Sequence, residues 1–236
     1  MRGSVLKKGI GAVPMLGHLI LVAPVFLLYH IGLLVSPRSA NGVDPITRLL
    51  GLVVGWSATA YLAIMAVFIL IYALVVWYLR KKGRFDPGWF SWVLLESGCY
   101  ALIMGPLTNL LLDQMHLLGR AIEKMGPLDR VVASAGAGFY EELVFRLAGL
   151  SLLLWMSDQH NMRRGLAVPL AVFLTSFVFS LVHYVGPGAD VFTSTSFAFR
   201  LVLGVFLASI FLSRGFSTAV YTHFLYDVYV MCVLMK

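Results

Sequence analysis

The chain has 236 residues, of which 60% are hydrophobic and only 12% charged, and its mean hydropathy is +0.88. Soluble globular proteins are about 25% charged, so this composition excludes an ordinary soluble domain and predicts an integral membrane protein. The net charge of +7 is therefore interpreted through membrane orientation and anionic lipid. No nucleic-acid partner is expected, because no cluster of Lys and Arg is interleaved with aromatic residues.

Seven apolar stretches are long enough, or nearly so, to cross a bilayer, which takes about 20 helical residues. They cover residues 10–35, 49–79, 89–112, 131–156, 165–185, 197–213 and 215–235. The connectors between them contain turn-forming and charged residues, as in SPRSANGVDP and RKKGRFDPG. An open sheet cannot satisfy its backbone in lipid. We therefore predict an all-α, polytopic helical membrane protein with about seven transmembrane helices in a single domain, residues 1–236.

The ends and connectors of these stretches predict how the chain lies in the membrane. The first stretch is longer than the apolar region of a signal peptide, so we expect it to remain as a helix. Residues 113–130 have apolar residues at helical spacing between charged ones, which predicts an interfacial helix or, alternatively, a solvated connector. Ten Lys and Arg residues fall on the side of the amino terminus and seven on the other. This bias predicts a multi-pass protein of the cell membrane with a cytoplasmic amino terminus.

The fourth stretch contains three ionisable residues, Glu141, Glu142 and Arg146, within AGFYEELVFRLAGL. A charged side chain at the centre of a bilayer costs about 2.5–3.5 kcal/mol, so each of them needs a partner. Glu142 and Arg146 can pair along one side of a helix, and the small residues of the preceding ASAGAG allow another helix to approach closely. Glu141 points to a different side, and we expect it to be functional. The alternative is that all three residues only hold helices together.

Two later stretches contain histidines in similarly apolar surroundings. His183 follows Phe179 by four residues, and His223 precedes Asp227 by four. Histidine exchanges protons near neutral pH, and a carboxylate one helical turn away can orient its ring. Because successive spans are antiparallel, Glu141 and both histidines are expected to converge on a cavity that opens to one membrane face and admits water.

Three motifs thus follow one another on successive apolar segments. They are EExxxR at 141–146, FxxxH at 179–183 and HxxxD at 223–227. Their order and placement resemble the CAAX protease and bacteriocin-processing family, also called the Abi family, which includes the type II CAAX prenyl endopeptidases. The resemblance covers residues 131–233. It implies a catalytic four-helix core at 131–235, preceded by amino-terminal spans at 1–112 whose role is unassigned.

The resemblance implies a glutamate-dependent intramembrane endopeptidase that needs no cofactor. In family terms, Glu141 and His183 activate the attacking water, and His223 with Asp227 stabilises the oxyanion. Three more matching residues are assigned to shaping the site: Glu142, Arg146 and Phe179. The implied partners are the lipid bilayer and a membrane-associated protein or peptide, such as a prenylated CAAX tail, a bacteriocin leader or the anchoring tail of a surface protein.

One position departs from the family pattern. Residue 227 is Asp, where the prenyl proteases tend to have Asn, and an ionised Asp cannot donate a hydrogen bond to an oxyanion. Either Asp227 orients and charges His223, which then acts as the donor, or Asp227 is itself protonated. We favour the first interpretation.

Two other functions remain open at this stage. Glu141, His183 and His223 form a ligand set of the kind that binds catalytic zinc, so a zinc-dependent intramembrane protease is one alternative. A noncatalytic scaffold or a proton-coupled transporter is the other. A transporter would be expected to have broken helices in both halves, whereas the buried ionisable residues predicted here lie in the second half only. No G-x-S-x-G or H-E-x-x-H motif supports a serine protease or a zincin.

Overall fold

The computed structural model describes residues 13–41, 43–44, 47, 57–81, 83–112, 125–186 and 189–234, with the backbone alone for 38 and 105–112. All regular structure in these residues is helical, which confirms the predicted all-α fold. In chain order the elements are α1 (Met15–Val35), the 3₁₀ turn η1 (Pro37–Ser39), α3 (Ala58–Arg80), α4 (Gly88–Leu112), α6 (Pro127–Gly136), the π-helix η2 (Ala137–Leu150), α7 (Ser151–Gln159), α8 (Arg164–Val182), α9 (Ser194–Arg214), α10 (Phe216–Tyr229) and the π-helix η3 (Val230–Leu234).

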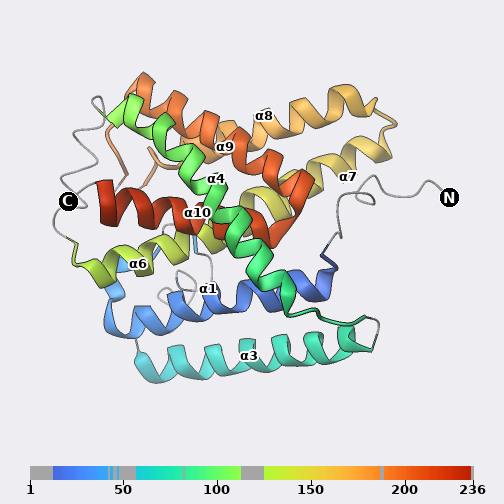
Figure 1. The fold of residues 1–236 in the computed structure, drawn as a ribbon, viewed down its shortest axis with the longest axis vertical. Helices are drawn as coiled ribbons and strands as arrows, with labels where there is room; N and C mark the ends of the chain where they lie inside the picture. The colour runs from blue at the N-terminus through green and yellow to red at the C-terminus, as the bar shows by residue number, and fades with distance from the viewer. Residues whose placement is uncertain are drawn as a thin grey trace.

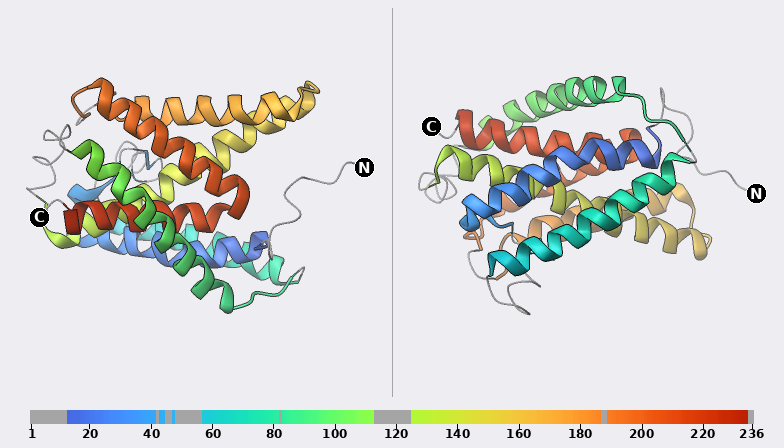
Figure 2. Two further views of the ribbon diagram at one scale, coloured as in Figure 1. Left: turned by 45° about the horizontal axis from the view of Figure 1, so that its top comes forward. Right: turned by 90° about the horizontal axis from the view of Figure 1, so that it is seen from below.

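The chain passes back and forth between two ends of the molecule (Figures 1 and 2). α10 lies in the middle and contacts α1, α4, α6, α9 and η2, whereas α3 lies at the edge beside α1. α8 packs along α9 and also contacts η2. The amino-terminal and carboxy-terminal halves of the described chain therefore share one bundle, and helices from both surround η2.

Four helices in the described residues are long and apolar enough to cross a membrane: α1, α3, α8 and α9. The other three predicted stretches are helical as well, in α4, in α6–η2–α7 and in α10–η3, but they are not among these four. The stretch from α6 to α7 changes to π-helical hydrogen bonding over η2 and contains buried ionisable residues. Seven transmembrane helices therefore stay a prediction.

Some predicted boundaries shift, and others fall outside the described residues. α9 begins at Ser194 rather than at 197, because the Thr193 hydroxyl accepts a 3.1 Å hydrogen bond from the Ser196 backbone N–H and caps the helix. Residues 10–12 and 49–56, at the starts of the first two stretches, lie outside the description. So do residues 113–124 of the predicted interfacial helix, whereas 127–130 form the first turn of α6.

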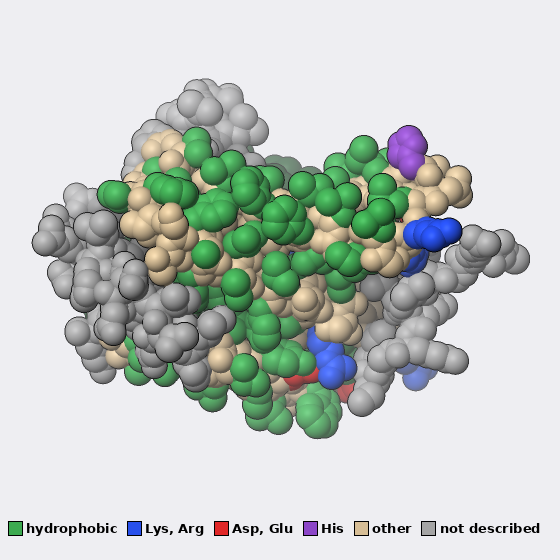
Figure 3. All heavy atoms as spheres, turned by 90° about the horizontal axis from the view of Figure 1, so that it is seen from above, with side chains coloured by type: hydrophobic (Ala, Val, Ile, Leu, Met, Phe, Trp, Pro, Cys, Tyr) green, Lys and Arg blue, Asp and Glu red, His purple; other side chains and the backbone are tan. Residues whose placement is uncertain are grey.

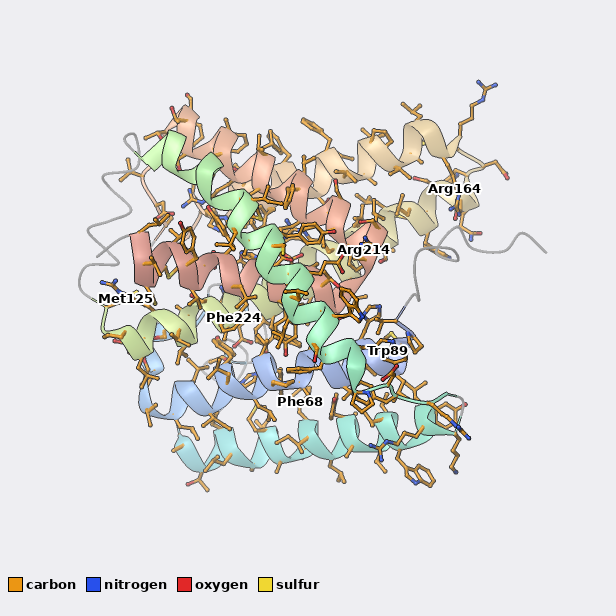
Figure 4. All side chains as sticks on the ribbon, in the orientation of Figure 1. Phe68, Trp89, Met125, Arg164, Arg214 and Phe224 are labelled. Carbon is orange, nitrogen blue, oxygen red and sulfur yellow. The ribbon has the colours of Figure 1, made fainter. Side chains whose placement is uncertain are left out.

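The small residues ahead of Glu141 bring two other helices close, as predicted. A Cβ atom added to Gly136 would lie 2.4 Å from Cε2 of Tyr29 on α1. One added to Gly138 would lie 2.8 Å from the backbone nitrogen of Phe224, which is labelled on α10 in Figure 4. Glycine leaves room for both contacts, so Gly136 sets how near the end of α6 comes to α1, and Gly138 sets how near η2 comes to α10.

The outside of the bundle is apolar. Only Tyr61 and Met65 are buried among the 23 residues of α3, and Figure 3 shows hydrophobic side chains spread over one face of the molecule. Arg164 and Arg214 lie towards the end at which α3 passes into α4, and Met125 lies at the opposite end (Figure 4). The predicted orientation places Arg164 and Arg214 on the same side of the membrane as the basic connector between α3 and α4, and the structure agrees with that grouping. Which end is cytoplasmic stays a prediction.

Candidate active site

Glu142, one of the two buried glutamates on η2, forms an ion pair with Arg146 on the same helix. Glu142 and Arg146 are 0% and 1% exposed, and Arg146 Nη1 donates a 2.9 Å hydrogen bond to Glu142 Oε1. Arg146 Nη2 also donates to the Gly204 carbonyl of α9, at 3.2 Å. The predicted pairing of Glu142 with Arg146 is therefore confirmed, and it also ties η2 to α9.

Phe179 joins this ion pair to both histidines. The guanidinium carbon of Arg146 lies 4.4 Å from the centre of the Phe179 ring, a cation–π geometry. The same ring lies 5.1 Å from the His183 ring and 6.1 Å from the His223 ring, centre to centre. Phe179 is 3% exposed, so it forms a buried apolar side of the cluster that contacts Arg146 and both histidines.

Glu142, rather than Asp227, makes the hydrogen bond that orients His223. His223 Nδ1 lies 2.8 Å from Glu142 Oε1, and because a carboxylate accepts hydrogen bonds, Nδ1 is the donor. Asp227 Oδ2 lies 3.6 Å from Nε2 of the same ring, beyond direct hydrogen-bond distance. The four-residue spacing on α10 brings Asp227 near Nε2 of His223. The other ring nitrogen, Nδ1, faces η2 and makes its hydrogen bond there. This pairing was not expected from the sequence.

Glu141 faces both histidines, as predicted. Its Oε2 lies 3.9 Å from His183 Nε2 and 3.8 Å from His223 Nε2. His183 Nδ1 lies 2.8 Å from the Phe179 carbonyl oxygen and donates to it, so in the neutral ring Nε2 presents its lone pair towards Glu141. The separation between Glu141 and His183 allows one water molecule to lie within about 2.8 Å of both acceptors and to donate a hydrogen to each.

The other oxygen of Glu141 has a partner that sequence reasoning missed. Asn41, which follows η1, donates a 2.9 Å hydrogen bond from Nδ2 to Glu141 Oε1. The two residues are 100 positions apart, and Asn41 belongs to no motif. Its only signal in the sequence is its place in the polar connector SPRSANGVDP. His30 on α1 is also held by two hydroxyls: its Nδ1 and Nε2 lie 2.6 and 2.7 Å from the Tyr61 and Tyr140 oxygens.

The site is most exposed at His183. Its side chain is 25% exposed and that of Asp227 is 16%, against 7% for Glu141 and for His223. His183 directly follows α8, and the turn beyond it is anchored to α9, because Arg200 Nη2 lies 2.5 Å from Asp190 Oδ2. The Asp190 backbone N–H in turn donates to the His183 carbonyl at 2.9 Å. His183, at the end of α8, is therefore the residue of the cluster that is most accessible from outside.

The described residues do not fit a metal centre. In this part of the chain, no group of three or more His, Cys, Asp and Glu side chains is arranged to hold a metal ion. A tetrahedral zinc with bonds of about 2.0–2.2 Å requires ligand atoms closer together than the 3.8–3.9 Å that separate Glu141 from the histidine nitrogens. The zinc alternative therefore has no support from this geometry.

Comparison with known proteins agrees with this site. Residues 125–229 match the family model described as Type II CAAX prenyl endopeptidase Rce1-like. The matched part runs from just before α6 to the end of α10 and contains all three motifs, so this part of the chain is similar to the Rce1-like type II CAAX prenyl endopeptidases. A match to this family implies peptidase activity. Comparisons with curated proteins and with solved structures gave no match.

Proposed function

We propose that this protein is a glutamate-dependent intramembrane endopeptidase that hydrolyses a peptide bond close to a membrane-anchored segment of its substrate. One observation carries the proposal: a single oxygen of the buried Glu141 carboxylate faces Nε2 of both His183 and His223, at 3.9 and 3.8 Å. Peptide hydrolysis needs a base for water, a donor for the oxyanion and exclusion of bulk solvent. The cluster has residues suited to each need.

In the first step, Glu141 accepts a proton from a water molecule that also donates a hydrogen bond to His183. The oxygen of that water bonds to the carbonyl carbon of the substrate, and the carbonyl π electrons move to its oxygen. Neutral His183 holds the water without adding charge. Its Nδ1 hydrogen is donated to the Phe179 carbonyl oxygen, which leaves the lone pair of Nε2 to accept a hydrogen from the water. This division of roles makes Glu141 the base and His183 the residue that positions the water.

In the second step, His223 stabilises the oxyanion. Protonated His223 has an N–H on each nitrogen: Nδ1 donates to Glu142, and Nε2 is free to donate to the oxyanion. The negative charges of Glu142 and Asp227, at 2.8 and 3.6 Å from the ring, balance its positive charge. The carbonyl then re-forms as the carbon–nitrogen bond breaks, and the leaving nitrogen takes the proton from Glu141. The products are a carboxylic acid and an amine, and transfer of the acid's proton to the amine gives a carboxylate and an ammonium group.

The proposed substrate is a protein attached to the same membrane. The matched family is named for prenylated CAAX tails, and a bacteriocin leader or the anchoring tail of a surface protein also presents a peptide at the bilayer. Four candidate spans and an apolar exterior support a membrane location. We further propose seven crossings of the cell membrane, with the site open to the non-cytoplasmic face.

Glu141→Gln tests this proposal. The change preserves size and polarity but removes basicity, so the cleavage rate is expected to fall by about 10²–10⁴-fold while the thermal unfolding temperature stays close to wild type. The matched control is Glu96→Gln, because Glu96 pairs with Arg214 at 2.6 Å in a partly exposed position on α4, away from the site.

Two measurements read out the result. One is cleavage of a farnesylated peptide with a CAAX ending. The other is mass spectrometry of membrane proteins that are cut in wild-type cells and left intact in the variant. Full activity of Glu141→Gln would remove Glu141 as the base. Activity that is lost with a chelator and restored by zinc would select a metalloprotease, whereas chelators are expected to leave the wild-type rate unchanged.

A further inference from the structure

We propose that Asn41, in the segment after α1, is a positioning residue of the active site that holds the Glu141 carboxylate with Oε2 turned towards the two histidines. The inference rests on the proposed function, since it assigns Asn41 to the base of that reaction. It places an essential part of the site outside residues 125–229, the part of the chain that matches the family model.

The hydrogen bond between the two side chains determines which oxygen faces the histidines. Asn41 Nδ2 donates to Glu141 Oε1 at 2.9 Å, and the other oxygen, Oε2, is the one that faces His183 and His223. The terminal torsion of a glutamate is broad and roughly two-fold. Without a donor at Oε1 the carboxylate can rotate, and Oε2 and His183 Nε2 then no longer accept hydrogen bonds from the same water.

Asn41 is itself held in place, so its amide can impose that orientation. Its Oδ1 accepts a 2.8 Å hydrogen bond from the Val43 backbone N–H, which leaves Nδ2 to point at Glu141. Its own backbone N–H donates to the Tyr29 hydroxyl at 2.9 Å, and that hydroxyl donates to Asp44 Oδ2 at 2.9 Å. Tyr29 and Asp44 are both 0% exposed. A buried chain of hydrogen bonds therefore links the end of α1 to Glu141.

Asn41 acts through geometry and hydrogen bonding, because its amide is uncharged. The charged and titratable groups around Glu141 lie on three elements: His183 after α8, His223 and Asp227 on α10, and Arg146 on η2, the helix of Glu141. In the described residues, no hydrogen bond from these groups reaches Glu141 Oε1, the oxygen that Asn41 holds. Loss of the amide donor should therefore affect the orientation of Glu141 and the ease with which it is protonated.

Asn41→Asp is the sharpest variant. It retains the shape and the Oδ1 acceptor for Val43 but replaces the donor with a second carboxylate facing Glu141. The value of kcat is expected to fall by about 10²-fold, as for misplacement of a catalytic group by about 1 Å, with KM little changed. The acid limb of the pH–activity profile should move to higher pH, because Glu141 loses a donor to its ionised form and gains a like charge beside it.

The remaining variants separate positioning from folding. Asn41→Gln retains an amide donor and is expected to recover part of the rate and the wild-type acid limb. Asn41→Ala removes the donor without adding charge, and it provides the same test if Asn41→Asp does not fold. The matched control is Asn161→Asp, at an exposed position in the turn after α7, and it should leave kcat, KM and the pH profile unchanged.

Failure of this inference is distinguishable from failure of the proposed function. If Glu141→Gln is inactive while folded Asn41→Asp and Asn41→Ala cleave the farnesylated peptide at the wild-type rate and with the wild-type pH profile, Asn41 has no positioning role and the glutamate mechanism stands. If Glu141→Gln retains full activity, the proposed function fails first. A reduced kcat without any shift of the acid limb in both variants would reduce Asn41 to a structural residue and overturn the proposal.

Discussion

The region from α6 to α10 and the region at the end of α1 both contact Glu141, but they supply different chemistry. The first contributes groups that can exchange protons or bear charge, namely His183, His223 and the ion pair of Glu142 with Arg146. The second contributes neutral hydrogen bonds, through Asn41 and the buried Tyr29. Reactive groups are drawn from a few residue types at regular spacing, so motifs reveal them. A neutral donor needs only to be in the right place, and no motif is required for that.

Of the variants that test this comparison, Glu142→Gln should lower the stability of the fold most. Glu142 is fully buried and accepts from both Arg146 and His223, so its loss leaves a buried arginine without its counter-charge. Removing one partner of a buried ion pair costs about 3–5 kcal/mol. The unfolding temperature of Glu142→Gln should therefore fall clearly below that of Glu141→Gln, as measured by thermal unfolding in detergent. Equal stability of the two variants would contradict the division between a structural and a reactive carboxylate.

Asp227 should have the next largest effect, and on activity rather than stability. Asp227→Ala removes a negative charge 3.6 Å from His223 Nε2 and is expected to lower kcat by about 10²-fold, similar to the loss of an oxyanion donor. Asp227→Asn should retain more activity, because an amide can still contact the ring or donate to the oxyanion itself. The measurement is kcat for the same peptide, and wild-type cleavage by Asp227→Ala would show that Glu142 alone prepares His223.

The smallest expected effect tests the junction between the two regions. In Gly136→Ala the new Cβ would lie 2.4 Å from the Tyr29 ring, which is fully buried and held by hydrogen bonds. Overpacking of this kind costs about 1–3 kcal/mol, and displacement of Tyr29 should also lower kcat through Asn41, by less than Asn41→Ala does.

Gly165→Ala is the matched control for Gly136→Ala, because nothing lies within 4 Å of a Cβ added at Gly165. Both variants are compared by thermal unfolding and by kcat. If they unfold at the same temperature and cleave at the same rate, the contact of α6 with Tyr29 does not matter for the site.

Features that depend on neighbours within one helix could be predicted from the sequence. The pairing of Glu142 with Arg146 follows from a spacing of four residues, and the structure confirms it. The small residues ahead of Glu141 also predict that another helix can approach closely, and the structure shows that α1 and α10 do so at Gly136 and Gly138. The apolar stretch places the start of α9 three residues too late, because hydrophobicity alone does not mark where a helix begins. Thr193, a favoured capping residue, sets the true start at Ser194.

By itself, the sequence determined that the chain is helical and apolar on the outside, and which residues have the chemistry for hydrolysis, because composition, periodicity and motif spacing are local properties. Only the tertiary structure decided which of these residues touch. The Nδ1 atom of His223 is held by Glu142, 81 positions away, and Glu141 is held by Asn41, 100 positions away. Such pairings depend on the rotation and depth of whole helices in the bundle, which packing sets and which a spacing along one segment does not encode.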